Sequence, residues 1–307
     1  MSTLPQIRGS ALLVAGDTTI AEITTDDCTP RTRFQIASLS KQFTAAAVLL
    51  LAERGVLRLD DPIGRWIGGC PRSWQDITLH HLLAHTSGLG HWHDYPMIDL
   101  ARRVEAVDLL ETFHRVAPLF PPGEGWHYSS PGYVLLANVA QRAADEPYRD
   151  LLTRTVFAPL QMEHTFAGSP ADRADVARGH DRDGSPVPSW ELDVVGMGTG
   201  DVWSTAGDLL AWIDGLRAGR LLGERYRKLM LTEQARTGGR EDASGYGYGW
   251  FLGAWAGRTW FHHSGENAGF RAFDACLPDT NLRVVVLTNC EATDPAVVTD
   301  LLAVALG

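Results

Sequence analysis

One long apolar segment stands out in the chain, residues 34–55, which read FQIASLSKQFTAAAVLLLAERG. After Ser40, apolar residues recur at helical spacing with almost no polar interruption, and Gly55 stands where a helix commonly ends. A helix that is apolar all round belongs inside a protein rather than on its surface. We therefore expect a deeply buried helix from about Ser40 to Arg54, preceded by the short apolar run 34–36.

Short β-branched runs lie near both ends of the chain. Residues 9–14 and 18–24 flank the turn signal Ala15-Gly16-Asp17, which predicts an opening hairpin. After Tyr246 the pattern typical of strands returns, and the chain ends in an apolar helix. The later strands are expected at residues 248–255, 258–261, 269–277 and 282–288, and the final helix at residues 295–305.

The middle of the chain has a different character. It is richer in Trp, Pro and Gly, its helical patterns are separated by long loops, and it contains no repeat or low-complexity linker. We therefore expect an α/β fold with two lobes: a sheet lobe of residues 1–57 and 224–307, and a mostly helical lobe of residues 58–223. A cleft between the lobes is the expected place for an active site.

The composition is that of an ordinary globular protein, with 307 residues, 45% hydrophobic and 21% charged. The formal net charge of −10 should repel phosphate backbones and anionic membranes, so we expect neither nucleic acid nor a membrane as partner. No run reaches the ~20 apolar residues of a membrane span, and the start lacks a signal-peptide pattern, which favours a cytoplasmic protein. The four cysteines are widely spaced and predict no zinc or redox site.

Ser38 and Lys41 are the first candidates for chemistry, because they lie where the chain enters the predicted helix. Free backbone N–H groups at a helix N-terminus favour a developing oxyanion. Lys41 follows one turn later on the same face, close enough to take a proton from the Ser38 hydroxyl. The S-x-x-K spacing alone is a weak signal, and the alternative is an N-cap serine followed by a lysine that reaches solvent.

The use of lysine strengthens the catalytic interpretation. Only two of the 27 lysine and arginine residues are lysines, Lys41 and Lys228, so this chain uses arginine wherever charge alone suffices. Burial lowers the pKa of a lysine, whereas arginine stays charged. A lysine inside an apolar helix is therefore expected to act as a base.

Further motifs follow in order along the chain. They are Leu59-Asp60-Asp61-Pro62, residues 82–89 (LLAHTSGL), Phe120-Pro121-Pro122-Gly123, Tyr128-Ser129-Ser130, Pro159-Leu160-Gln161-Met162, residues 200–209 (GDVWSTAGDL) and His263-Ser264-Gly265. With residues 34–45, they resemble the serine β-lactamase and penicillin-binding-protein-like family, in the branch of class C β-lactamases, D-alanyl-D-alanine carboxypeptidases, D-aminopeptidases and family VIII-type esterases. The resemblance covers nearly the whole chain. It implies a central antiparallel sheet built from both chain ends and flanked by helices, a mostly helical lobe, and catalytic Ser38 and Lys41.

Tyr128 matches the tyrosine of the family's second motif, which implies a second proton handler that serves Ser38 and the leaving group. That motif is usually Tyr-x-Asn, and this chain has Ser130 in the third place. Asparagine offers an amide donor and acceptor, whereas serine has only a hydroxyl on a shorter arm. We therefore expect ester or other small acyl substrates rather than penicillins and cell-wall peptides.

The family's third motif matches residues 263–265, His-Ser-Gly. The resemblance implies that His263 lines the cleft and tunes Tyr128 and Lys41, and that Gly265 lets the substrate approach the backbone closely. The backbone N–H of the next residue, Glu266, would pair with that of the nucleophile to form an oxyanion hole worth roughly 3 kcal/mol per donor. The Glu266 side chain need not take part.

Residues 91–94, His-Trp-His-Asp, suggest a metal site, because two imidazoles and a carboxylate can chelate. No third histidine or glutamate follows in a recognisable spacing, so the signal is weak and we expect neither metal nor cofactor. A loop that flanks the cleft is the preferred interpretation, with Trp92 as an aromatic wall for the substrate.

These observations together predict a serine hydrolase that works through an acyl-enzyme, carboxylesterase-like, on a small-molecule acyl substrate. Two alternatives stay open. One is a D-amino-acid-specific peptidase or amidase, a DD-carboxypeptidase or a weak β-lactamase. The other is a non-hydrolytic protein, either a penicillin-binding sensor or a structural homologue.

Overall fold

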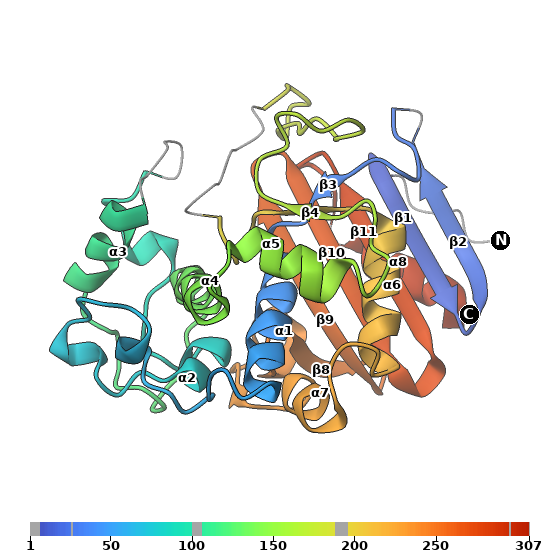
Figure 1. Ribbon diagram of the computed structural model, residues 1–307. Coiled ribbons are helices and arrows are strands. Elements are labelled where there is room, and N and C mark those ends of the chain that lie inside the picture. Colours follow the sequence, from blue (N-terminus) through green and yellow to red (C-terminus); the bar gives the residue numbers. More distant parts are fainter. Residues whose placement is uncertain (1–6, 26, 100–105, 188–195, 295, 307) are drawn as a thin grey trace.

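A computed structural model of the chain describes residues 7–25, 27–99, 106–187, 196–294 and 296–306 (Figure 1). Within these residues, the main feature is an eight-stranded sheet formed by β1 (Gly9–Ala15), β2 (Thr18–Thr24), β6 (Ala235–Arg236), β7 (Ala243–Tyr246), β8 (Phe251–Trp255), β9 (Arg258–Asn267), β10 (Phe270–Leu277) and β11 (Leu282–Thr288). Their order is β2-β1-β11-β10-β9-β8-β7-β6, and every neighbouring pair is antiparallel. The N-terminal hairpin thus pairs with the last strand, which confirms a sheet built from both chain ends.

Helices cover the sheet and build the rest of the molecule. They are α1 (Ser40–Glu53), α2 (Leu79–Leu83), α3 (Ala106–Arg115), α4 (Ser130–Ala144), α5 (Tyr148–Leu152), α6 (Ala206–Arg217), α7 (Glu224–Met230) and α8 (Ala296–Leu306). Short helical turns supplement them: η1 (Ala37–Leu39), η2 (Ile63–Arg65), η3 (Arg72–Trp74), η4 (Trp92–Asp94), η5 (Thr153–Phe157), η6 (Arg240–Asp242) and η7 (Pro278–Thr280).

The central strand β11 is covered on both faces of the sheet, which explains why it reads LRVVVLT and is buried throughout. Val285 and Leu287 belong to the core that includes α1 and α6, whereas Val284 and Val286 pack with α8. Successive strand residues point to opposite faces, so a strand covered on both sides is apolar at most of its positions, as β11 is apart from Arg283 and Thr288.

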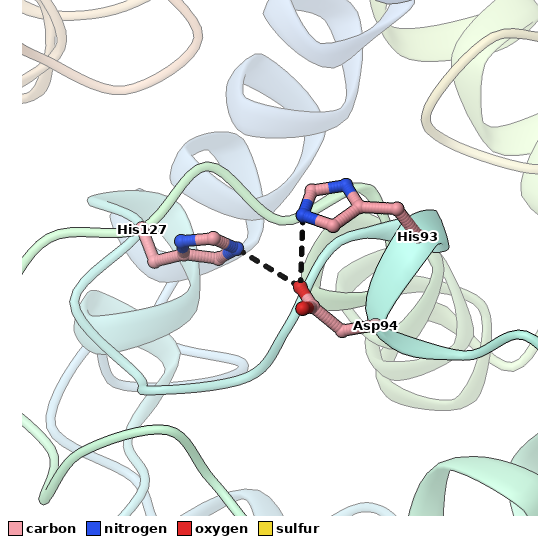
Figure 2. A group of neighbouring side chains, drawn as sticks. All are labelled: His93, Asp94 and His127. Atoms are coloured by element: carbon pink, nitrogen blue, oxygen red, sulfur yellow. Dashed lines mark hydrogen bonds and ion pairs between the residues drawn. The ribbon is translucent and has the colours of Figure 1, made fainter.

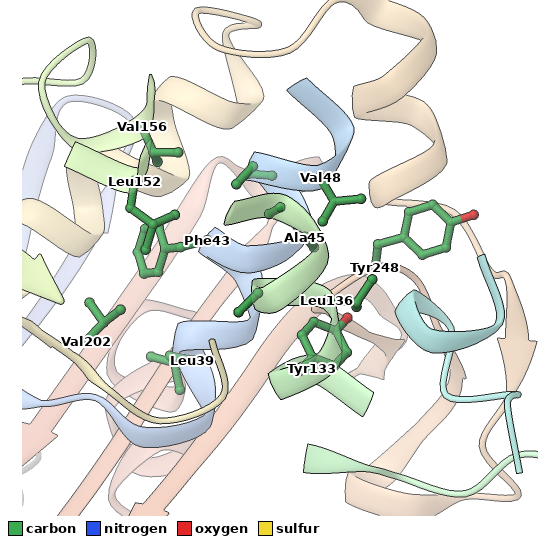
Figure 3. Close-up of a cluster of buried hydrophobic side chains, with 14 of the residues drawn as sticks. Leu39, Phe43, Ala45, Val48, Tyr133, Leu136, Leu152, Val156, Val202 and Tyr248 are labelled. Atoms are coloured by element: carbon green, nitrogen blue, oxygen red, sulfur yellow. The ribbon is translucent and has the colours of Figure 1, made fainter. Parts of the chain in front are cut away.

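Helix α1 lies at the centre of the molecule, as its all-round apolar sequence predicts (Figure 1). Every residue from Ser40 to Ala52 is buried. Figure 3 shows side chains of α1 packed against α4 on one flank, and against α5 and η5 on the other, with Phe43 close to Leu152 and Val156. Such a helix provides a rigid base for a site at its N-terminus.

The helices α2, α3 and α4 gather on one side of α1, away from the sheet (Figure 1). Their apolar side chains join those of α1 and the sheet in one continuous core. Helix α6 lies within residues 58–223 but packs against β1 and β11, so this segment also contributes to the covering of the sheet. The division into residues 1–57 with 224–307 and residues 58–223 remains a prediction.

Some elements differ from the sequence-based expectation. The strand predicted at residues 258–261 extends to Asn267, which places His263, Gly265 and Glu266 all on β9. Helix α7 was not expected, nor was a small sheet in the order β3-β5-β4, formed by β3 (Phe34–Gln35), β4 (Phe166–Ala167) and β5 (Val202–Ser204). No helix in the described residues is long and apolar enough to cross a membrane.

A buried polar network fixes α1 to the sheet beneath it. Gln42 Nε2 donates to both carboxyl oxygens of Asp274 on β10, at 2.8 and 2.9 Å. Trp212 Nε1 on α6 donates to Gln42 Oε1 at 2.6 Å. Burial raises the pKa of Asp274 to about 8, against the opposing effect of the hydrogen bonds from Gln42. The carboxyl group is therefore protonated in the folded chain up to nearly this pH.

This network predicts a pH-dependent stability difference between the wild-type chain and Asp274→Asn. An unfolded aspartate has a pKa of about 3.9, so between about pH 4 and pH 8 the folded wild-type chain holds a proton that the unfolded chain has lost. As the pH rises through this range, the free energy of unfolding of the wild type should fall relative to that of the variant, by roughly a few kcal/mol in all. Urea unfolding of both proteins at about pH 5 and about pH 9 measures the difference. A difference that does not change with pH would contradict the assignment.

Candidate active site

Ser38 lies in the short 3₁₀ turn η1, between β3 and α1. The sequence predicts it at the helix N-terminus, and the structure places it in the turn that leads directly into that helix. Within residues 34–52 it is the only residue that is not buried. The preceding residue, Ala37, has φ 48°, a left-handed conformation that is costly for a residue with a side chain and is frequent at functional sites. The turn therefore presents one hydroxyl from an otherwise buried segment.

Lys41 is completely buried in the first turn of α1. Its Nζ atom donates to Ser38 Oγ at 3.0 Å and to the backbone carbonyl of Thr199 at 3.0 Å. Burial lowers the pKa of Lys41 well below its ordinary value. A neutral amine has a lone pair, which can accept the proton of the Ser38 hydroxyl across this short contact. The spacing predicted from the sequence thus brings the two groups together.

Tyr128 lies beside this pair. Its ring centre is 5.0 Å from Lys41 Nζ, and its buried hydroxyl has no hydrogen-bond partner of good geometry among the described residues. Burial raises the pKa of Tyr128 above its ordinary value, and the neighbouring Ser38 side chain opposes this effect only in part. The phenol is therefore protonated at neutral pH and can donate to a group that enters the site.

His263 faces the same side of the sheet, where it lies opposite Asp274 in the pairing of β9 with β10. Both of its ring nitrogens are engaged: Nδ1 with the carbonyl of Ser264 at 2.6 Å, and Nε2 with the Tyr246 hydroxyl at 3.3 Å. Its ring centre is 6.1 Å from that of Tyr128. Burial lowers the pKa of His263 to about 3, so it is neutral and packs as part of the aromatic wall around Tyr128.

Gly265 allows β9 to approach the turn that carries Ser38. A Cβ atom at this position would collide with the backbone carbonyl oxygen of Ile36. The family resemblance implies that this glycine serves substrate access, whereas the close approach in the structure is to Ile36. The pairing of β8 with β9 ends at His262. Residues 263–267 stay paired with β10, and on the side left by β8 the strand borders η1.

The Glu266 side chain is directed away from the site, where it forms an ion pair with Arg271 at 2.8 Å. This agrees with the expectation that only its backbone would take part. His262 lies on the face opposite His263 and packs against Trp260 and Phe273. The oxyanion hole formed by the N–H groups of Ser38 and Glu266 remains a prediction.

Ser130 is the first residue of α4, and Ser129 caps that helix by accepting from the Gly132 N–H at 3.0 Å. The Ser130 N–H donates to His91 Nδ1 at 3.2 Å. Burial lowers the pKa of His91 to about 3. A neutral histidine that accepts at Nδ1 carries its proton on Nε2, so His91 offers a donor next to Tyr128, whose ring centre is 5.5 Å away.

Two further residues near Tyr128 were not predicted as part of the site. His85, from the LLAHTSGL motif, packs its ring 4.4 Å from that of Tyr128 and accepts from the Ser129 N–H at 3.1 Å. The Arg240 guanidinium in η6 lies 5.3 Å from the Tyr128 ring centre. Trp92 packs against Phe113 of α3, at 6.1 Å between ring centres, so its described ring contacts lie on the helical side of the molecule.

Comparison with known proteins supports the family resemblance. The family model described as Beta-lactamase matches residues 1–307. Penicillin-binding protein 4* of Bacillus subtilis is 39% identical over 140 residues, 43% of this chain and 30% of that protein. Esterase EstB of Burkholderia gladioli is 32% identical over 260 residues, 71% of this chain and 66% of that protein. The alignments thus span less than two thirds of either relative.

The fold is shared with solved structures. A crystal structure of D-amino acid amidase from Ochrobactrum anthropi SV3, complexed with L-phenylalanine, aligns with a TM-score of 0.84 and 25% identity, over 98% of this chain and 94% of that one. Both the sequence match and the fold extend over nearly the whole length of the chain. The chain therefore belongs to the beta-lactamase family.

Proposed function

We propose that the protein is a serine hydrolase that works through an acyl-enzyme. The observation that carries this proposal is the buried Lys41 amine, 3.0 Å from the Ser38 hydroxyl. Burial without a described carboxylate partner favours the neutral amine, which is the form able to act as a base.

In the proposed acylation, Lys41 takes the Ser38 proton while Oγ attacks the carbonyl carbon of the substrate. The N–H groups of Ser38 and Glu266 hold the oxyanion. Tyr128 then donates its proton to the departing alcohol, and recovers one from the Lys41 ammonium. Water attacks the acyl-enzyme in the second step, loses its proton to the same pair, and Ser38 regains its hydroxyl hydrogen as the acid departs.

We propose small esters as the preferred substrates. Ser130 supports this, because it replaces the asparagine whose amide would hold a peptide-like group. The relative EstB is named as an esterase, which agrees with this preference. His91, beside Tyr128, is neutral, so it adds no positive charge that would attract an anionic substrate.

A second candidate is hydrolysis of D-amino-acid amides or peptides. Hydrolysis of peptides is favoured by Arg240, an exposed cation whose guanidinium lies 5.3 Å from the Tyr128 ring centre, where it could hold the carboxylate of a peptide substrate. The structural neighbour named as a D-amino acid amidase agrees with it.

Turnover of a p-nitrophenyl ester, a D-alanyl peptide, D-phenylalanine amide and a chromogenic cephalosporin separates these candidates. We expect the ester to have the largest kcat/KM, and Ser130→Asn to raise the activity on amides relative to the ester. Arg240→Ala should lower activity only on substrates that carry a carboxylate. Activity confined to peptides and amides would overturn the ester preference, and loss of the activity on the D-alanyl peptide in Arg240→Ala would establish the second candidate.

A further inference from the structure

We propose that His93, Asp94 and His127 bind one divalent metal ion of the zinc class. The three side chains come from two segments that lie 33 residues apart in the sequence, the turn η4 and the residues just before Tyr128. Figure 2 shows both imidazoles directed at the Asp94 carboxylate. Their ligand atoms all lie within 4.8 Å of one another. The sequence alone offers only the first two ligands, and the fold supplies the third.

The spacing of the ligand atoms fits such an ion. Asp94 Oδ2 is 3.1 Å from His127 Nε2 and 3.4 Å from His93 Nε2. Ligand atoms at about 2.0–2.2 Å from a tetrahedral zinc ion are roughly 3.3 Å from one another. Two of the edges of the tetrahedron are therefore already present, and a small movement of the exposed His93 ring completes the third.

The carboxylate is held in place before any ion binds. The His91 N–H donates to Asp94 Oδ2 at 2.7 Å, which leaves the other lone pair of this oxygen for a metal. Gly90 makes room for the carboxylate, because a Cβ atom there would lie 2.6 Å from Asp94 Cβ. This arrangement resembles the outer hydrogen bonds that orient carboxylate ligands in metal sites.

The donor set indicates the class of ion. Two imidazoles and one carboxylate, with no thiolate, suit zinc, cobalt or nickel better than calcium, magnesium or copper(I). The His93 side chain is 67% exposed, and those of Asp94 and His127 are 23% and 26% exposed, so an ion can enter from solvent and retain water as a fourth ligand. Without metal, the same groups would form only weak exposed ion pairs.

An ion at this position would join two segments that border the candidate active site. His127 directly precedes Tyr128. His91 lies next to the turn that carries His93 and Asp94, and it accepts a hydrogen bond from the Ser130 N–H. The ion would therefore hold Tyr128 and Ser130 against the turn. This inference does not depend on the reaction proposed above.

Calorimetric titration of the tag-free, chelator-treated protein with Zn²⁺, and visible spectroscopy with Co²⁺, test the site. We expect one ion per chain and a Co²⁺ absorption band in the wild type. His93→Ala and His127→Ala should each weaken binding by at least about tenfold and remove the band. His164→Ala, a partly buried histidine of another segment, serves as the matched control and should bind as the wild type does.

Zn²⁺ should also raise the melting temperature of the wild type in a concentration-dependent way, and that of the two variants much less. His93 is exposed, so His93→Ala should keep the fold, and circular dichroism verifies this. The proposal is overturned if the wild type binds no ion at micromolar concentrations. It is equally overturned if folded His93→Ala and His127→Ala bind with unchanged affinity.

Discussion

Replacement of Lys41 by methionine should lower kcat/KM for a p-nitrophenyl ester by at least about a thousandfold. Methionine fills the volume of the buried stem without an amine, so the chain should stay folded. The Ser38 hydroxyl then has no base within reach, because its contact with Nζ at 3.0 Å is lost. Steady-state kinetics on the folded variant give the result.

The chain offers a matched control for this substitution, because its second lysine, Lys228, is exposed on α7. Lys228→Met makes the same substitution at an exposed position and should leave kcat/KM unchanged. If Lys41→Met retains more than about a tenth of wild-type activity, another group activates Ser38 and the proposed mechanism is wrong.

Tyr128→Phe should lower kcat by roughly a hundredfold to ten-thousandfold. The hydroxyl it removes is buried and has no well-formed hydrogen bond in the described residues, so the variant should be at least as stable as the wild type. A loss of activity without a loss of stability is the signature of a group held for chemistry. Kinetics and thermal unfolding of the same preparation give both quantities.

Tyr226→Phe is the control, since the Tyr226 hydroxyl donates to the Ala52 carbonyl at 3.1 Å on the far end of α1. It should leave kcat unchanged and cost about 1 kcal/mol of stability at most. Full activity in Tyr128→Phe would show that Tyr128 only packs against its neighbours and does not transfer protons.

The parts of the fold that depend on local patterns could be predicted from the sequence. The apolar segment after Ser40 forms the buried helix α1, because no other location satisfies a helix without a polar face. The β-branched runs at both ends form one sheet, because such residues favour strands. Once the helix forms, the spacing of three residues brings Lys41 into contact with Ser38. The motif resemblance identified Tyr128 and His263, which lie close to that pair.

The remaining features depend on contacts between distant segments. Nothing in residues 91–94 indicates that His127 meets Asp94, because only the path of the loop brings them together. The role of Gly265 follows from the carbonyl of Ile36, which lies far away in sequence. Arg240 reaches Tyr128 from a glycine-rich turn whose conformation no periodic pattern reveals.

Mass spectrometry after reaction with a fluorophosphonate probe tests the central claim most directly, because it asks whether Ser38 is a nucleophile at all. The account predicts one adduct per chain on the peptide that contains Ser38, none in Ser38→Ala, and much slower labelling in Lys41→Ala. An unlabelled Ser38 in folded wild-type protein, or a rate that is the same with and without Lys41, would contradict it.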